Sequence, residues 1–187
     1  MNESFRTGAH THSTAKEKPV SLTAIIDATA SAVDADPSSA TVVFRTEGSS
    51  TAGVASTLRA RQHSLSVDEP PTLGGDDTAA NPVEYALAAL VSCQVVTYRF
   101  WAAKLGIELD EITVEAEGDL DVRGFFGLDD AARAGFSAVR VSVRLSGPEG
   151  EDRYQELRQA VDEHCPVLDL FANNTPLRTD LHVAADA

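Results

Sequence analysis

The sequence predicts an α+β fold, in which strands and helices occupy separate stretches of the chain. Apolar and polar residues alternate over parts of residues 20–67, as expected for antiparallel strands. The run 85–96 is almost entirely apolar and follows a helix-start signal, as expected for a long buried helix. Alternation returns at 112–117 and 136–145 before a second helical pattern. This order favours α+β over a parallel, doubly wound sheet.

Three segments open the fold as predicted strands. They are residues 20–27, 41–46 and 53–67, each rich in β-branched residues. Residues 68–80 follow with Pro-Pro, Gly-Gly and Asp-Asp pairs, which are typical of turns. We therefore expect an opening sheet whose last strand is joined to a long helix by this loop.

The long helix has a well-marked start and end. Asn81 is the predicted N-cap, Pro82 takes the first helical position and Glu84 the third, where its carboxylate can complete a capping box. Gly106 is the expected stop, so the helix runs to about Leu105.

Cys93 lies well inside this helix. It follows Pro82 by about 16 Å along the axis at 1.5 Å per residue, beyond the first turn where the helix dipole acts. A free thiol has a pKa of about 8.5, and apolar surroundings raise that pKa. Cys93 therefore needs a cation or a hydrogen-bond donor to become a nucleophile, and an arginine from elsewhere in the fold is the natural candidate.

The second half of the chain predicts two half-buried strands, a helix and a closing strand. Residues 112–117 and 136–145 each place apolar side chains on one face. Residues 124–135 between them form a loop or a short helical turn. Residues 151–164 carry Tyr154, Leu157 and Val161 at helical spacing, and Pro166 is expected to end that helix. Residues 177–183 read as a final strand.

Cys165 is the second cysteine and directly precedes Pro166. At the end of a helix its thiol lies near carbonyl groups, whose partial negative charge disfavours a thiolate. We therefore expect Cys165 to be the poorer attacking thiol and the better resolving partner.

Composition limits the classes of partner. A chain of 187 residues suits one domain, which can bury about 70% of its unfolded surface without a disulfide or metal. The net charge of −14 argues against nucleic acid. Residues 1–18 are polar and lack the apolar stretch of a secretory signal, so we expect a mobile tail, a single domain over 19–187, and a cytoplasmic protein. Gln94 and Arg99 interrupt the apolar run, which argues against a membrane span.

Three segments together carry a family likeness. They are Val67-Asp-Glu-Pro-Pro-Thr-Leu-Gly-Gly-Asp-Asp, Asn81-Pro-Val-Glu-Tyr-Ala-Leu-Ala-Ala-Leu-Val-Ser-Cys93, and His164-Cys-Pro-Val-Leu-Asp-Leu followed by Asn174-Thr-Pro-Leu. From about Val20 to its end the chain resembles the OsmC/Ohr family of osmotically inducible and organic hydroperoxide resistance proteins. The resemblance implies an intertwined α+β homodimer with antiparallel sheets packed around a long central helix.

The resemblance also implies an activity. Cys93 matches the peroxidatic cysteine and Cys165 the resolving cysteine of a thiol-dependent peroxidase that reduces organic hydroperoxides. A dithiol reductant would then restore both thiols, and no metal, haem or flavin is required.

The sequence departs from the family pattern at one position, and no motif fixes the position of the arginine. Val83 stands where family peroxidases carry a glutamate, and Glu84 follows one residue later, about 100° further round the helix. We expect Glu84 chiefly to cap the helix and keep it as the candidate site carboxylate. The arginine is not fixed by any motif, and we place Arg61 and Arg59 ahead of Arg45.

Other functions compete with the peroxidase. A buried cysteine often acts only as a small apolar residue, although the pairing of Cys93 with Cys165 favours redox chemistry. A non-catalytic module could instead bind a small molecule or acyl ligand near Cys93, Tyr98, Phe100 and Trp101, residues that are more often core. A zinc site is disfavoured because the two cysteines lack the spacing of ligand pairs.

Overall fold

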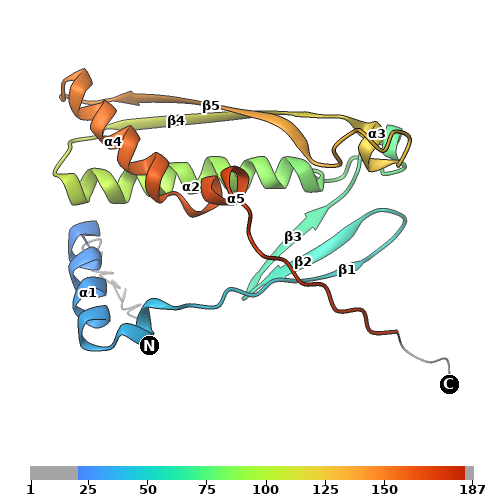
Figure 1. The fold of residues 1–187 in the computed structure, drawn as a ribbon, viewed down its shortest axis with the longest axis horizontal. Coiled ribbons are helices and arrows are strands. Elements are labelled where there is room, and N and C mark those ends of the chain that lie inside the picture. The colour runs from blue at the N-terminus through green and yellow to red at the C-terminus, as the bar shows by residue number, and fades with distance from the viewer. Residues whose placement is uncertain (1–20, 184–187) are drawn as a thin grey trace, which may run out of the picture.

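The central helix α2 (Pro82–Leu105) organises the molecule. The computed structural model describes residues 21–183, so the predicted tail over 1–18 lies outside the described residues. The hairpin of β4 (Glu111–Leu120) and β5 (Phe136–Ser146) lies along one side of α2, and α4 (Glu151–His164) and α5 (Pro166–Ala172) pack across it (Figure 1). This mixture of helices and small antiparallel sheets confirms the predicted α+β class.

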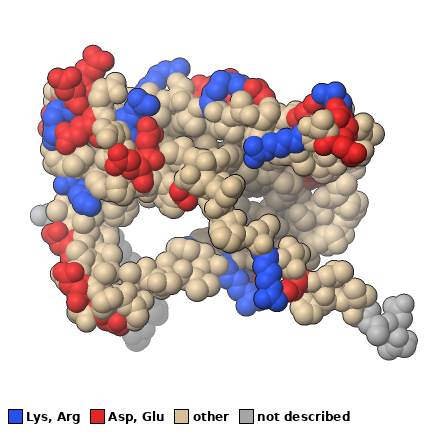
Figure 2. Space-filling model, viewed as in Figure 1, with Lys and Arg blue, Asp and Glu red and all other residues tan. Residues whose placement is uncertain are grey.

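A second sheet lies apart from this body. Its strands are β1 (Glu47–Ser50), β2 (Ser56–Ala60) and β3 (His63–Val67), paired antiparallel in the order β1-β2-β3. The remaining elements are α1 (Leu22–Ala35), the short 3-10 helices η1 (Pro37–Ala40) and η2 (Pro71–Leu73), and the single turn α3 (Val122–Phe125). Figure 2 shows an opening between the body and the segment that joins α1 to β1, so a single chain does not fill the space between these two parts.

The predicted start and end of α2 are confirmed. The side-chain oxygen of Asn81 accepts the Glu84 backbone N–H at 2.9 Å, and the Glu84 carboxylate accepts the Asn81 backbone N–H at 2.8 Å. These two bonds form a capping box with Pro82 at the first helical position. Gly106 ends the helix at φ 63°, a left-handed conformation that glycine adopts without a Cβ clash.

The β4–β5 hairpin is also as predicted, with two longer strands. Ile112 pairs with Leu145, Val114 with Val143, and Ala116 with Val141, so the apolar residues share one face. Alternate residues of β4 are half-buried along its whole length, because that face packs on α2.

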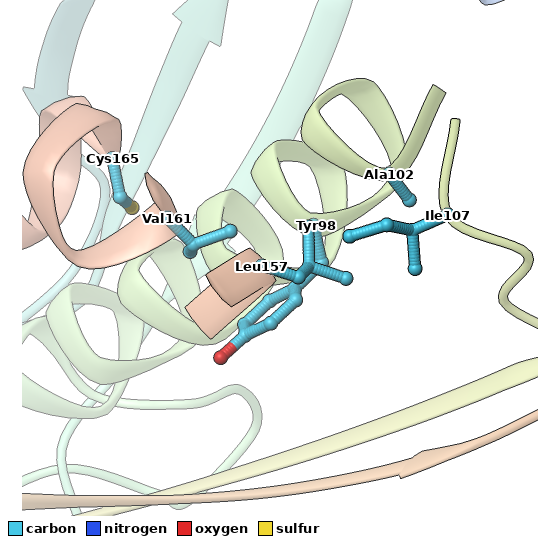
Figure 3. Packing of buried hydrophobic residues seen from close by; sticks show 6 residues of the cluster. All are labelled: Tyr98, Ala102, Ile107, Leu157, Val161 and Cys165. Carbon is cyan, nitrogen blue, oxygen red and sulfur yellow. The ribbon is translucent and has the colours of Figure 1, made fainter. Parts of the chain in front are cut away.

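A small core joins α2 to α4. Its buried members come from both helices and the turns beside them: Tyr98, Ala102, Ile107, Leu157, Val161 and Cys165. Figure 3 shows the Tyr98 ring against Leu157, with its hydroxyl pointing out of the cluster on the side of the strands. Cys165 lies at the edge of the same cluster, so this core fixes the position of one of the two thiols.

The prediction of a strand over 20–27 is wrong. The structure forms the helix α1, which includes five alanines, the strongest helix former. Leu22, Ile26 and Val33 are its half-buried residues, at spacings of four and seven that fit one face of a helix rather than a strand.

Three other predicted strands need correction. Residues 41–46 form no strand, and the first strand starts at Glu47. Residues 53–67 form a hairpin, β2 and β3, with Arg61 at φ 57° in the turn. Residues 177–183 are irregular, with Leu177 91% and Leu181 85% exposed. Their alternating pattern is that of a strand, but no described segment pairs with them.

Asp68 holds the loop between β3 and α2. Its side chain is almost fully buried and accepts hydrogen bonds from the backbone N–H groups of Glu69, Asp76 and Thr78 and from the Thr78 hydroxyl. These bonds lower the pKa of Asp68 from 3.8 to about 2, the Thr78 N–H contributing most. One carboxylate therefore orders the loop that delivers the chain to the Asn81 cap.

Replacing Asn81 with alanine should lower the free energy of unfolding by about 1 kcal/mol, because the Glu84 N–H loses its acceptor. Chemical denaturation of both proteins measures this difference. Replacing the exposed Asp180 with alanine serves as control, and an equal loss in both variants would contradict the capping role.

Replacing Asp68 with asparagine should lower the thermal midpoint at neutral pH, because the amide offers one acceptor oxygen where the carboxylate offers two. A carboxylate whose pKa falls on folding stabilises the fold above its unfolded pKa and loses that contribution as pH falls through its folded pKa. The gap between the parent and D68N should thus shrink from about pH 4 to about pH 2. Thermal melts across this range measure the gap, and one that stayed constant would count against the charge.

Candidate active site

Cys93 lies in the middle of α2 and is half-buried. Its side chain packs against the core cluster of Tyr98, Leu157, Val161 and Cys165. The long helix thus carries the thiol into the body of the protein, far from either helix end, as the sequence predicts.

Cys165 lies between two helices and is 2% exposed. It caps the C-terminus of α4, where its N–H donates to the Val161 carbonyl at 2.9 Å. It is also the N-cap of α5, whose Asp169 N–H donates to the Cys165 carbonyl at 3.0 Å. Pro166 therefore ends one helix and begins another, so the surroundings of Cys165 include amide groups of α5 as well as the carbonyl groups predicted from the sequence.

The fold brings the two cysteines together. Cys165 belongs to the core cluster against which the Cys93 side chain packs, and the two thiols lie close enough for Cys165 to raise the Cys93 pKa. The backbone N–H of Val167 lies near enough to the Cys93 thiol to act on its pKa, and the Thr97 hydroxyl lies 4.0 Å from the sulfur while donating to the Cys93 carbonyl at 2.7 Å. The first turn of α5 thus places an amide group near the Cys93 thiol, and the residue before that turn carries the second thiol.

The surroundings of Cys93 favour the neutral thiol. Burial raises its pKa above the ordinary value, and the neighbouring Cys165 adds to the rise. The Val167 N–H and the Thr97 hydroxyl act in the opposite direction because they stabilise the thiolate. None of these groups is a cation. Within the described part of one chain, hydrogen-bond donors lie near the Cys93 thiol, but no cation stabilises its thiolate.

The predicted arginines lie on the separate sheet or just before it. Arg59 is in β2, exposed, and 3.8 Å from the Glu47 carboxylate of β1. Arg61 occupies the β2–β3 turn, and Arg45 lies in the irregular segment before β1. Within one chain, therefore, the structure does not bring these arginines to Cys93.

Glu84 has a defined structural role. Its carboxylate completes the capping box by accepting the Asn81 backbone N–H. Glu84 lies nine residues before Cys93 on the same helix. That capping role agrees with the sequence, whereas the catalytic part implied for Glu84 stays a prediction.

The aromatic residues near Cys93 serve mainly as packing. Tyr98 is 1% exposed and belongs to the core. Trp101 packs against His164 with ring centroids 4.2 Å apart and the rings tilted by 39°, and the Lys104 ammonium lies 4.2 Å from the centre of the indole. The contact of Trp101 with His164 joins the last turn of α4, next to Cys165, to α2.

Two observations bear on metal binding and on membranes. Within residues 21–183, no cluster of three or more histidine, cysteine, aspartate or glutamate side chains could hold a metal ion. By length and composition α2 could cross a bilayer, which is weak evidence because a core helix passes the same test. In this fold α1, β4, α4 and α5 all pack on α2, and 28% of its apolar stretch is buried within one chain.

Val167 and Thr97 were not predicted from the sequence. Proline directly after Cys165 is a helix-start signal that could have indicated α5 and its amide donor. Thr97 lies one turn after Cys93, a spacing that places the two side chains on one face.

Comparison with known proteins agrees with this geometry. The family model described as OsmC-like protein matches residues 74–180, which is more than half of the chain. None of the curated proteins matches the sequence.

Several solved structures share the fold at low sequence identity. An OsmC-like protein from Mycoplasma pneumoniae superposes with a TM-score of 0.62 at 14% identity, over 70% of this chain and 88% of the other. An organic hydroperoxide resistance protein OsmC from Legionella pneumophila gives 0.56 at 20% identity, over 72% and 93%. An organic hydroperoxide resistance protein from Elizabethkingia anophelis, solved with thiocyanate bound, gives 0.55 at 20% identity, over 71% and 91%. The chain belongs to the family of OsmC-like proteins.

Proposed function

We propose that this protein reduces organic hydroperoxides to alcohols, with Cys93 as the attacking thiol and Cys165 as the resolving thiol. The observation that carries the proposal is the packing of Cys93 against the core cluster that contains Cys165, which brings the two thiols near each other. Family membership supports it, since some structural relatives are organic hydroperoxide resistance proteins.

The reaction has three steps. The Cys93 thiolate attacks the distal peroxide oxygen, the O–O bond breaks, and the leaving alkoxide takes a proton to become the alcohol. The resulting Cys93 sulfenic acid condenses with the Cys165 thiol, which forms a disulfide and releases water. A dithiol reductant then exchanges with the disulfide, restores both thiols and is itself oxidised to a disulfide.

The positions of the two thiols suit the second step. Condensation needs the two sulfurs to meet, and the packing of Cys93 against the cluster that contains Cys165 supports this step. The Val167 N–H lies near Cys93, where it can stabilise the developing thiolate. The apolar residues of the cluster beside Cys93 favour an alkyl hydroperoxide over hydrogen peroxide.

We propose that the working form is a homodimer. One chain leaves large apolar side chains exposed on two extended segments, with Val43 93%, Phe44 91% and Leu177 91% exposed. The opening between the body and the segment that joins α1 to β1 leaves room for a second copy (Figure 2), and so does the separate β1–β3 sheet. A second copy would cover these surfaces and could bring its own β2–β3 hairpin towards Cys93.

The homodimer also offers a source for the missing cation. Arg61 and Arg59, ahead of Arg45, are the proposed partners of the Cys93 thiolate, supplied across the dimer. A guanidinium beside the sulfur would lower the Cys93 pKa against the effect of burial. A cytoplasmic location stays a prediction.

Replacing Cys93 with serine should abolish turnover of cumene hydroperoxide by the reduced protein with a dithiol, because the nucleophile is lost. Replacing Cys165 with serine should allow one reduction per chain and trap a sulfenic acid, which dimedone labelling and mass spectrometry detect. If the unaltered protein keeps both thiols titratable after treatment with hydroperoxide, the protein is instead a non-catalytic binding module.

Mixed dimers test the origin of the arginine. Arg61→Ala and Cys93→Ser should each be at least about tenfold less active alone, since one lacks the cation and the other the nucleophile. If the arginine comes from the second copy, refolding the two variants together restores one complete site in each mixed dimer, or about a quarter of the parent activity after random pairing. No recovery with Arg61→Ala, Arg59→Ala or Arg45→Ala would exclude these three arginines as residues acting across the dimer.

A further inference from the structure

A small cavity lies on a different face of α2 from Cys93. It has a volume of about 170 Å³ and lies between α2, β5, α4 and the start of α5. Four polar side chains and three apolar ones line it: Gln94, Tyr98, Arg158, Asp162, Val141, Val143 and Leu168. The peroxidase steps proposed above use none of these polar groups.

Gln94 is the unusual residue of this cavity. Its side chain is 2% exposed, and its amide nitrogen has no hydrogen-bond partner among the described residues. A buried amide donor without an acceptor destabilises a fold, so such a group indicates that something else supplies the acceptor. The remainder of the cavity wall shows what kind of acceptor fits.

Two more donors converge on the same space. The Tyr98 hydroxyl points out of the core cluster towards the strands (Figure 3), and burial raises its pKa to about 12, so it stays protonated and able to donate. The Arg158 guanidinium lies at the solvent side, with its side chain 64% exposed and its Nε 3.4 Å from an Asp162 carboxylate oxygen. That ion pair leaves the two terminal nitrogens of Arg158 available to a ligand.

An apolar cavity adjoins this polar one. It has a volume of about 460 Å³ and shares Val141 and Leu168 with the smaller cavity. Its other apolar walls include Phe136, Val139 and Phe171. Val141 is 36% exposed although it lies on the face of β5 that packs on α2, so the chain itself leaves this part of the sheet uncovered.

We propose that these two cavities form a binding site for an apolar monocarboxylic acid. The carboxylate would accept hydrogen bonds from Gln94, Tyr98 and Arg158, and the alkyl chain would lie along Val141 and Leu168 into the larger cavity. A carboxylate fits better than a neutral carbonyl because it offers two acceptor oxygens and suits the planar guanidinium. Asp162 repels the ligand, which sets the affinity below what three donors alone would give.

The site does not depend on the thiol chemistry. Gln94 and Tyr98 project from α2 roughly 100° or more round the helix axis from Cys93. Ligand binding can therefore be measured on a protein whose Cys93 has been replaced by serine. Failure of the peroxidase proposal would leave this binding untouched, and the reverse also holds.

Octanoate is the probe, and octan-1-ol, with the same chain and no carboxylate, is its control. Titration calorimetry on the full chain with Cys93→Ser should show octanoate binding at least about tenfold tighter than octan-1-ol, as expected for charge-assisted hydrogen bonds. Equal affinities for the two probes would overturn the proposal. No binding of octanoate would overturn it as well, which is the result expected if a second copy of the chain fills the cavities.

Three variants locate the carboxylate. Gln94→Leu and Arg158→Met should each weaken octanoate binding about fivefold or more and leave octan-1-ol unchanged, whereas Asp162→Asn should strengthen octanoate binding. Arg133→Met is the matched control, because Arg133 lines the apolar cavity but not the polar one and should not contact the carboxylate. Octanoate affinity that survives Gln94→Leu, or that depends on Arg133 instead of Arg158, would exclude the site as proposed. Asp162→Asn alters an exposed side chain and keeps the test valid if a buried variant fails to fold.

Discussion

The burial of α2 is the constraint on which the whole fold depends. This helix is apolar over most of its length, and α1, the β4–β5 hairpin, α4 and α5 all pack on it. Its two ends are fixed by local chemistry, a capping box at Asn81 and a left-handed glycine at Gly106. Because the two ends of the helix are fixed, the positions of the residues along it, including Cys93 and Gln94, are fixed too.

The same burial sets the chemical problem of the site. An apolar environment holds the two thiols near each other, but it also favours the neutral thiol. The Val167 amide offsets part of that effect, and a guanidinium would have to supply the remainder. The arginines predicted from the sequence lie on the β1–β3 sheet or just before it, the part of the chain that packs least on its own body. The proposed homodimer and the proposed activating arginine are therefore linked, because the second copy of the chain would supply the arginine.

Short sequence patterns correctly predicted the features of the fold that depend on residues close together in the chain. The cap, the stop and the Cys93 position of α2 follow from residues adjacent in sequence, and the paired faces of β4 and β5 follow from simple alternation. The strand predicted at 20–27 failed because a short apolar stretch fits both periods, and the alanines that decide for a helix lie mostly beyond it. The contact of Val167 with Cys93 depends on how α5 turns back onto α2, which no local pattern encodes. The predicted strand at 177–183 has the right alternation without a described neighbour, since pairing depends on which strands meet.

The contact between the Trp101 and His164 rings has a practical consequence. Trp101 is the sole tryptophan of the sequence, and His164 directly precedes Cys165. An indole is an intrinsic fluorophore whose emission responds to the groups in contact with it, so this ring acts as a built-in optical reporter for the junction of α4 and α5. Any rearrangement of that junction during a catalytic cycle can be followed in real time without a label.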